Sequence, residues 1–144
     1  MARIHINFPD KFIFSTELPV RVSDLNYGGH VGNDAILTIM QEARTQFYRS
    51  MGFESELKLE GLIGQVVADA AVVYKSESFF GDVLRIEIAL GEIHKYGFDL
   101  FYKITNSATG KDVAHGKTGI ICFDYENRKM ALVPESLQKK LAAL

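Results

Sequence analysis

One long apolar helix, predicted over residues 33–51, limits the folds that this chain can adopt. Apolar residues recur there with the period of an α-helix, at Ile36, Met40, Ala43 and Phe47. Further apolar side chains, at Leu37, Ile39 and Tyr48, widen this stripe, so we expect the helix to be buried on several sides. Asn33 or Asp34 should cap its start, and Gly52 stands where a helix commonly ends.

The rest of the chain is predicted to be mostly β-strand. One bent strand, over residues 12–24, precedes the helix, and Pro19 within it indicates a place near a sheet edge. Four strand-like stretches follow the helix, over residues 63–75, 83–93, 98–106 and 113–123. The turn signals between them, at 80–82, 95–97 and 107–110, predict hairpin-like links and hence an antiparallel meander. A short helix with Pro134 at its first position should end the chain.

This order of elements predicts an α+β fold in which a curved antiparallel sheet of about five strands wraps around one long central helix. A length of 144 residues fits a single domain over residues 1–144. The apolar fraction of 47% and the charged fraction of 24% are those of an ordinary globular protein, so we expect no disordered region.

Composition excludes several classes of function. The 16 basic and 18 acidic residues give a net charge of −2 with no basic run, so a nucleic-acid partner is not supported. Cys122 is the single cysteine, in an apolar run that predicts a buried thiol. His5, His94 and His115 have no metal-ligand spacing with one another, so a metal site is not expected. Without a signal-peptide pattern or an apolar span of membrane length, the predicted location is the cytoplasm and no membrane partner is expected.

The segment before the helix, Asn26-Tyr-Gly-Gly-His-Val-Gly-Asn33, has the composition of a tight turn. Its glycines permit positive φ and a close approach of the backbone to a ligand. The backbone N–H groups around residues 29–33 should lie unpaired at the positive end of the helix dipole, where they can stabilise an oxyanion. These features allow a substrate site at the turn, and they equally allow glycines that only shape it.

The sequence around this turn resembles that of a known protein family. The stretch Arg21-Val-Ser-Asp-Leu-Asn-Tyr-Gly-Gly-His-Val-Gly-Asn33, followed by Gln41-Glu-Ala-Arg44, is similar to the hotdog-fold acyl-CoA thioesterases related to 4-hydroxybenzoyl-CoA thioesterase. Phe80-Gly-Asp-Val-Leu84 and Ala131-Leu-Val-Pro-Glu135 extend the likeness over nearly the whole chain. The resemblance implies the hotdog fold, hydrolysis of acyl-CoA to free acid and coenzyme A, and no metal or redox cofactor. It also implies a homodimer or homotetramer with sites at the subunit interface.

The predicted catalytic residues are Asn26, His30 and Asp69. Asn26 stands where many family members carry a catalytic aspartate, and its uncharged amide can only orient a water or the thioester carbonyl. His30 is a general base or a residue that only fixes the turn. Asp69 lies in an apolar strand, where a buried carboxylate must have partners, be protonated or line a cavity. The residues predicted to bind substrate are Asp24, Tyr27, Gly28, Gly29, Val31 and Asn33.

Two other functions remain open at this point. The first is hydrolysis of acyl carrier protein thioesters, which a basic surface beside the site would favour. The second is a non-catalytic hotdog protein that binds acyl thioesters, which the missing aspartate allows. Five cations are candidate phosphate contacts for coenzyme A, although each also fits an ordinary solvated charge: Arg85, Lys95, Lys103, Lys117 and Arg128.

Overall fold

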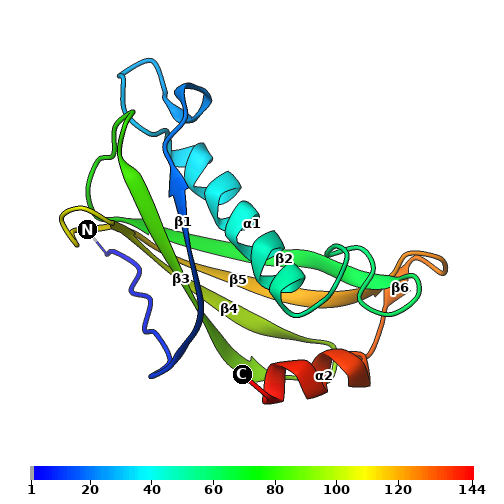
Figure 1. Cartoon of the computed structure of the whole chain (residues 1–144). Coiled ribbons are helices and arrows are strands. Elements are labelled where there is room, and N and C mark those ends of the chain that lie inside the picture. The colour runs from blue at the N-terminus through cyan, green and yellow to red at the C-terminus, as the bar shows by residue number, and fades with distance from the viewer. Residues whose placement is uncertain (1) are drawn as a thin grey trace.

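The computed structural model describes residues 2–144 and consists of one curved antiparallel sheet with a long helix across one face (Figure 1). Its strands are β1 (Phe12–Pro19), β2 (Ile63–Tyr74), β3 (Val83–Ile93), β4 (Gly97–Asn106), β5 (Asp112–Asp124) and β6 (Lys129–Met130). Its helices are α1 (Asn33–Ser50), α2 (Glu135–Ala142) and the short 3-10 turn η1 (Val22–Asp24). The predicted sheet around one long helix is confirmed, with β6 as a two-residue addition at the edge of β5.

The strand order is β1-β3-β4-β5-β2, which corrects the predicted meander. Strands β3, β4 and β5 do form the expected hairpins, but β2 pairs with β5 and not with β3. Both sides of β3 are already occupied, by β1 and β4, so the open place for β2 is beside β5. The link from β2 to β3 around residues 80–82 is consequently a crossing connection and not a hairpin. Strands β1 and β2 form the two long edges of the sheet.

The first strand ends earlier than predicted, at Pro19. The Val20 amide donates to the carbonyl of Asp82 at 2.9 Å, and the chain then enters η1, where the Asp24 amide donates to the Arg21 carbonyl at 3.0 Å. The Asp24 side chain also accepts from the Arg21 backbone amide at 2.8 Å. These local bonds replace ladder pairing, so residues 22–24 form a turn that delivers the chain to the start of α1.

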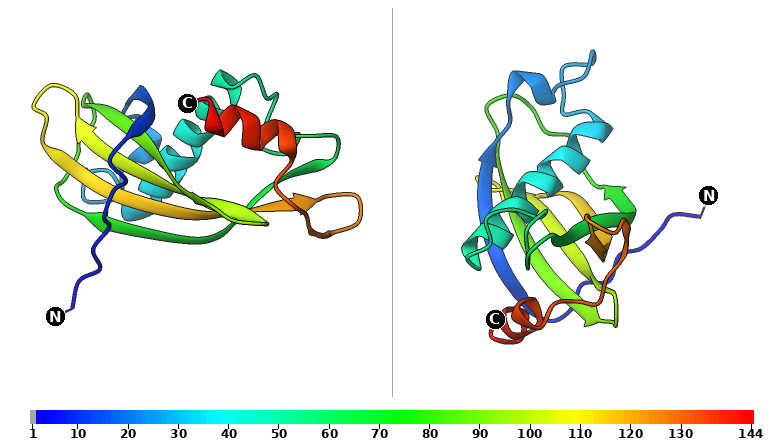
Figure 2. Two further views of the ribbon diagram at one scale, coloured as in Figure 1. Left: turned by 90° about the horizontal axis from the view of Figure 1, so that it is seen from below. Right: turned by 90° about the vertical axis from the view of Figure 1, so that its right-hand side faces the viewer.

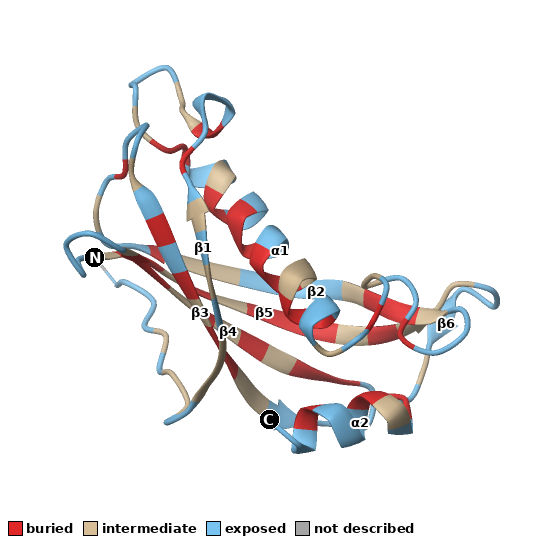
Figure 3. Cartoon of the chain, viewed as in Figure 1, coloured by how far each residue is buried: buried red, intermediate tan, exposed pale blue. Residues whose placement is uncertain are grey.

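Helix α1 has the boundaries and burial that its apolar period predicts. Buried residues recur along the length of the helix (Figure 3). The core-facing side chains are all at most 3% exposed, and they are Ile36, Met40, Ala43, Phe47 and Tyr48. The predicted N-cap is wrong, because Gly32 takes that position and no side-chain cap bond is present among the described residues. The C-terminal end is confirmed: Gly52 has φ of 93°, and the Phe53 amide donates to the Tyr48 carbonyl at 3.2 Å.

The two faces of the sheet differ in character. Alternate residues of β4 and β5 that face α1, including Leu100, Tyr102 and Ile120, are at most 1% exposed. A Cβ at Gly116 would lie 2.7 Å from the Met40 side chain, so this glycine allows α1 to approach the sheet closely. The opposite face is partly covered by the N-terminal segment, residues 2–11, which leaves the sheet on the side away from α1 (Figure 2).

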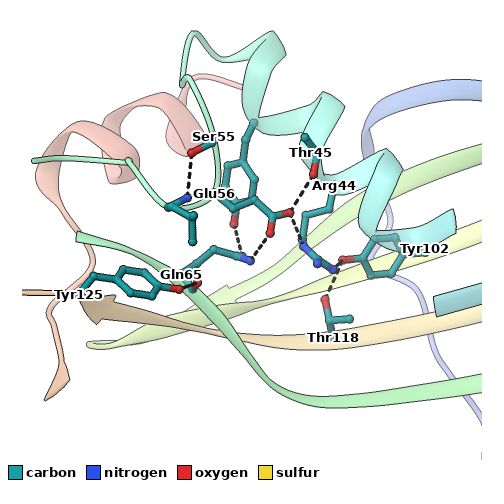
Figure 4. Close-up of polar contacts among 10 residues, drawn as sticks. Arg44, Thr45, Ser55, Glu56, Gln65, Tyr102, Thr118 and Tyr125 are labelled. Atoms are coloured by element: carbon teal, nitrogen blue, oxygen red, sulfur yellow. Dashed lines mark hydrogen bonds and ion pairs between the residues drawn. The ribbon is translucent and has the colours of Figure 1, made fainter. Parts of the chain in front are cut away.

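A polar network lies between α1 and the sheet (Figure 4). Arg44, only 4% exposed, donates from Nε to Glu56 Oε1 at 2.8 Å and from Nη1 to the Tyr102 hydroxyl at 3.2 Å. Burial disfavours the charged guanidinium, but Tyr102 and Glu56 together raise the pKa of Arg44 above its usual value. Gln65 donates to the other oxygen of Glu56 at 2.9 Å and accepts from the Tyr48 hydroxyl at 2.8 Å. The network ties the loop after α1 to the helix and to β2.

Cys122 is fully buried, as its apolar surroundings predict. Desolvation raises the pKa of its thiol to about 11, which keeps the thiol protonated at neutral pH. Across residues 2–144, no helix combines the length and the hydropathy that a membrane crossing requires.

Candidate functional site

The turn between η1 and α1 is closed by its own backbone. The Asn26 amide donates to the His30 carbonyl at 2.8 Å, and the Gly29 amide donates to the Asn26 carbonyl at 3.1 Å. Gly29 has φ of 81°, a conformation that favours glycine, as the sequence predicts for this segment. The turn therefore holds Asn26 and His30 at fixed positions beside the first residues of α1.

A hollow of about 380 Å³ opens between this turn and the end of β2. Its lining combines the turn, the start of α1 and the segment that follows β2, and consists of Asn26, His30, Val31, Asn33, Tyr74, Lys75, Ser76 and Glu77. The Val31 amide donates to the Ser78 carbonyl at 2.8 Å, which binds the two segments together. Figure 1 shows the turn at the top of the molecule with the β2–β3 connection rising beside it. We call this hollow the turn cleft.

His30 has an oxygen atom near each ring nitrogen. Its Nδ1 lies 3.3 Å from the Val31 carbonyl oxygen, and its Nε2 lies 3.8 Å from Glu77 Oε1. The imidazole is 34% exposed, so a small molecule in the cleft can reach it. A histidine in this setting can hold and release a proton next to a ligand.

The Asn26 amide is oriented by the turn. Its Oδ1 accepts from the Gly28 backbone amide at 2.9 Å, which leaves the Nδ2 protons to donate elsewhere. A Cβ at Gly28 would lie 3.2 Å from Asn26 Oδ1 and 3.3 Å from His30 Nε2. Glycine at this position therefore lets the two predicted catalytic side chains come close to the backbone.

The backbone donors are fewer than predicted. Three amides of the turn are already paired: Gly29 donates to Asn26, Val31 to Ser78, and Gly32 to Asp24. The first amides of α1, at Asn33 and Asp34, have no intrahelical acceptor because they begin the helix, and no side chain caps them among the described residues. Of the amides that the sequence predicts to be unpaired around residues 29–33, those of Gly29, Val31 and Gly32 are thus occupied, whereas the amide that begins α1 is not.

Tyr74 lines the turn cleft, whereas Tyr27 does not. The Tyr74 hydroxyl donates to the Asn33 carbonyl at 2.9 Å, so β2 is joined to the first residue of α1. Partial burial, with the Asp34 charge, raises the pKa of Tyr74, and its hydroxyl stays neutral. Tyr27, a predicted substrate contact, is fully exposed at the tip of the turn and is not among the residues that line the cleft.

Asp24 belongs to a different environment from the cleft. It is 5% exposed and accepts from Arg21 Nη2 at 3.0 Å and from the Arg21 backbone amide at 2.8 Å. Burial opposes the charged carboxylate, but the bonds from Arg21 outweigh it and hold the pKa of Asp24 below its ordinary value. Together with Arg21 it lines a separate groove of about 280 Å³ against the outer side of α1. Its observed contacts are those of a structural acceptor.

The expectation that Asp69 is buried is wrong. A β-bulge between Val67 and Asp69 interrupts the pairing of β2 with β5, and the Asp69 side chain is 66% exposed. It accepts from Lys117 Nζ at 2.7 Å and from the Gly119 amide at 2.9 Å on the sheet face away from α1. The hydrogen bond from Lys117 lowers the pKa of Asp69. Within residues 2–144, Asp69 lines a different hollow, which shares no lining residue with the turn cleft.

The cleft contains residues that the sequence analysis missed. Tyr74, Lys75, Ser76 and Glu77 form a run of polar residues directly after the apolar part of β2. A polar run at a strand end is a signal for a functional loop. What the sequence alone could not provide is the crossing connection, which brings this run beside the turn.

Among residues 2–144, no three histidine, cysteine, aspartate or glutamate side chains gather as a metal site requires. The residues that line the turn cleft provide an imidazole, an amide, a lysine, a carboxylate and the first amide of α1. These groups can donate to a carbonyl oxygen, hold a water and accept its proton.

Several solved structures of other proteins are similar to this fold. A structure of a 1,4-dihydroxy-2-naphthoyl-CoA thioesterase from Synechocystis matches with a TM-score of 0.83 and 20% identity, over 91% of this chain and 96% of that chain. A gentisyl-coenzyme A thioesterase matches with a TM-score of 0.79 and 20% identity, over 88% and 98%. A hypothetical protein from Staphylococcus aureus, solved in complex with CoA, matches with a TM-score of 0.81 and 18% identity, over 96% and 87%. At these identities the likeness establishes the hotdog fold.

No curated protein matches the sequence significantly. A family model does: the thioesterase-like superfamily matches residues 20–141, from the end of β1 into α2. That stretch includes the turn, α1 and the polar run after β2, and thus every residue that lines the turn cleft. Because the match spans most of its length, the chain belongs to the thioesterase-like superfamily.

Proposed function

We propose that this protein is a hydrolase that cleaves acyl-CoA thioesters to a free acid and coenzyme A, with the turn cleft as its active site. The observation that carries the proposal is the meeting of His30, the Asn26 amide and the start of α1 in one hollow. Membership of the thioesterase-like superfamily supports thioester hydrolysis. The choice of coenzyme A rests on the similar structures, two of which are named for CoA thioesters and one of which holds CoA.

In the proposed reaction the thioester carbonyl oxygen points toward the first amides of α1. The N–H groups of Asn33 and Asp34 and the positive end of the helix dipole stabilise the negative charge that forms on this oxygen. Asn26 supports the same oxygen through Nδ2, because its Oδ1 is held by the Gly28 amide. This arrangement needs no charge at position 26.

His30 acts as the general base. With Nδ1 protonated and donating to the Val31 carbonyl, Nε2 carries the lone pair and accepts a proton from the attacking water. The water oxygen bonds to the carbonyl carbon, the C–S bond then breaks, and the proton on Nε2 passes to the leaving sulfur. The products are the free acid and the thiol of coenzyme A.

Lys75 is the cation that lines the cleft, and we assign it to a phosphate of the coenzyme. Two of the cations considered from the sequence have other partners. Lys117 is bound between Asp69 at 2.7 Å and Asp99 at 3.3 Å, and Arg128 lies 5.4 Å from the Phe123 ring centre.

A panel of short, long and aromatic acyl-CoAs tests the proposal, with release of free thiol as the measurement. We expect turnover of at least one member, and His30→Ala should lower kcat on the order of 100-fold because the proton acceptor is lost. The melting temperature should change little, since the His30 side chain is 34% exposed. If folded wild-type protein binds acyl-CoA without turnover, the protein is a non-catalytic binding module and not an enzyme. If it turns over only acyl carrier protein thioesters, the carrier is acyl carrier protein and not coenzyme A.

The Asn26→Asp variant separates two mechanisms in the same assay. If Asn26 donates to the carbonyl oxygen, a carboxylate there removes the donor and repels the oxyanion, so kcat should fall. A rise in kcat would instead show that the site works through a carboxylate at this position. A large loss of kcat in Asp69→Asn would contradict a site confined to the turn cleft.

We also propose that the protein works as a homodimer or homotetramer. The motivating feature is β2, a strand of 12 residues on an edge of the sheet, whose exposed apolar residues include Val67 at 41% and Tyr74 at 45%. A long, uncovered edge strand with apolar side chains tends to pair with another chain. Tyr74 also lines the turn cleft, so pairing along β2 would place a second subunit beside the site.

A further inference from the structure

We infer that Glu77 supplies the negative charge that Asn26 lacks, as the positioning residue that stabilises the protonated form of His30 during thioester hydrolysis. The inference rests on the proposed function. The sequence alone does not indicate this role, because Glu77 lies 51 residues from Asn26 along the chain and shares no recognisable motif with it.

The geometry places one oxygen at each end of the imidazole. Glu77 Oε1 is 3.8 Å from Nε2, and the Val31 carbonyl oxygen is 3.3 Å from Nδ1. The ionised Glu77 carboxylate is negative, and the imidazole becomes positive when Nε2 takes a proton. At 3.8 Å these opposite charges attract, so Glu77 favours the imidazolium that forms when His30 takes a proton from water.

Two features hold Glu77 at this place. The next residue, Ser78, is 1% exposed and accepts from the Val31 amide at 2.8 Å, so the backbone beside Glu77 is anchored to the backbone beside His30. On the other side, Tyr74 is tied to the Asn33 carbonyl at 2.9 Å. Only the three residues 75–77 lie between these two anchors.

The proposed hydrolysis needs no reactant other than water and the thioester. Water gives its oxygen to the carbonyl carbon and one proton to His30 Nε2, and the positive charge that forms on the imidazole lies near the Glu77 carboxylate. When the C–S bond breaks, this proton moves to the sulfur and His30 returns to its neutral form. Glu77 itself forms no covalent bond and keeps its charge throughout.

The 3.8 Å separation is longer than a direct hydrogen bond, and the Glu77 side chain is 65% exposed. Its effect is thus that of a nearby charge, which dissolved salt can screen. This distinguishes Glu77 from a residue that only shapes the cleft, because a shaping role would not depend on ionic strength.

The experiment compares Glu77→Gln with wild type at saturating acyl-CoA. The matched control is Glu135→Gln, because Glu135 in α2 is also an exposed glutamate with one cation nearby, Lys139 at 3.2 Å. We expect Glu77→Gln to lower kcat about tenfold with little change in KM, and Glu77→Asp to restore part of the loss. In 1 M salt, where the screening length is about 3 Å, wild-type kcat should fall toward that of Glu77→Gln.

A second readout does not need turnover. The ring ¹⁵N resonances of His30, assigned by their loss in His30→Asn, report the surroundings of each nitrogen. We expect the Nε2 resonance to move in Glu77→Gln and to stay in place in Glu135→Gln.

The outcomes separate the two proposals. If wild type turns over acyl-CoA but Glu77→Gln behaves like Glu135→Gln in both readouts, the role of Glu77 is overturned and the proposed function stands. If no acyl thioester is turned over by folded wild type, the proposed function fails, and the catalytic role of Glu77 fails with it whatever the resonances show.

Discussion

Asp24 shows how a single carboxylate can be used for structure within a functional segment. Its contacts with Arg21 close η1, and its backbone carbonyl accepts from the Gly32 amide at 2.9 Å, directly before α1. The residue therefore positions the turn that carries Asn26 and His30. Its effect on activity is expected to pass through the shape of the turn.

The Asp24→Asn variant tests this role by its dependence on pH. The Arg21 bonds hold the pKa of Asp24 below 3.8, so the charge stabilises the folded state above that value and the contribution is lost as the pH falls through the lower, folded-state pKa. At pH 7 the free energy of unfolding should be about 1–2 kcal/mol lower in the variant, because a charge-assisted bond is removed. Urea unfolding at pH 7 and below pH 3.8 should show the difference shrinking in acid. The exposed Asp10→Asn serves as control, and an equal loss at both pH values would contradict the assignment.

At the scale of elements, the link between α1 and the sheet is a polar network within an apolar layer. Glu56 accepts from Arg44 at 2.8 Å and from Gln65 at 2.9 Å, which joins the loop after α1 to the helix and to β2. A buried ion pair of this kind adds little to the stability of the fold compared with an apolar pair of the same shape. Removal of one partner is costly, however, because the other charge is left buried and unpaired.

We therefore predict that Glu56→Leu lowers the free energy of unfolding by about 3–5 kcal/mol, because Arg44 is left charged and 4% exposed. The double variant Arg44→Met with Glu56→Leu should recover much of this loss. As a control, Glu54→Gln breaks an exposed pair with Lys58 at 3.9 Å and should cost less than about 1 kcal/mol. A double variant as unstable as Glu56→Leu would show that the network, and not the unpaired charge, sets the stability.

At the scale of the whole molecule, the open question is what covers the β2 edge. We predict from light scattering at micromolar concentration that the wild type is a dimer or a tetramer. Val67→Lys should shift the distribution toward monomer, because a lysine on an edge strand disfavours strand pairing. Val83→Lys is the matched control, since Val83 has a similar exposure of 37% but lies on β3. A monomeric wild type would contradict the expected assembly.

The sequence predicted the local features of this protein well. The period of apolar residues identified α1, the turn signals at 80–82 and 95–97 identified the bounds of β3, and Gly52 marked the helix end. The position of the turn and the positive φ of Gly29 also follow from composition. These features depend on residues close together in the chain, whose sterics and hydrogen bonds act whatever the rest of the molecule does.

What only the tertiary structure decided is the pairing of distant segments. Placement of β2 beside β5 depends on which strand edges remain open after β1, β3 and β4 have paired, and no local pattern records it. The same pairing turns Asp69 outward to Lys117 and carries Glu77 to His30. By itself, then, the sequence determined the turn, the helix and the family. The strand order decided which carboxylate lies beside the imidazole, because contacts between distant residues exist only once the sheet is assembled.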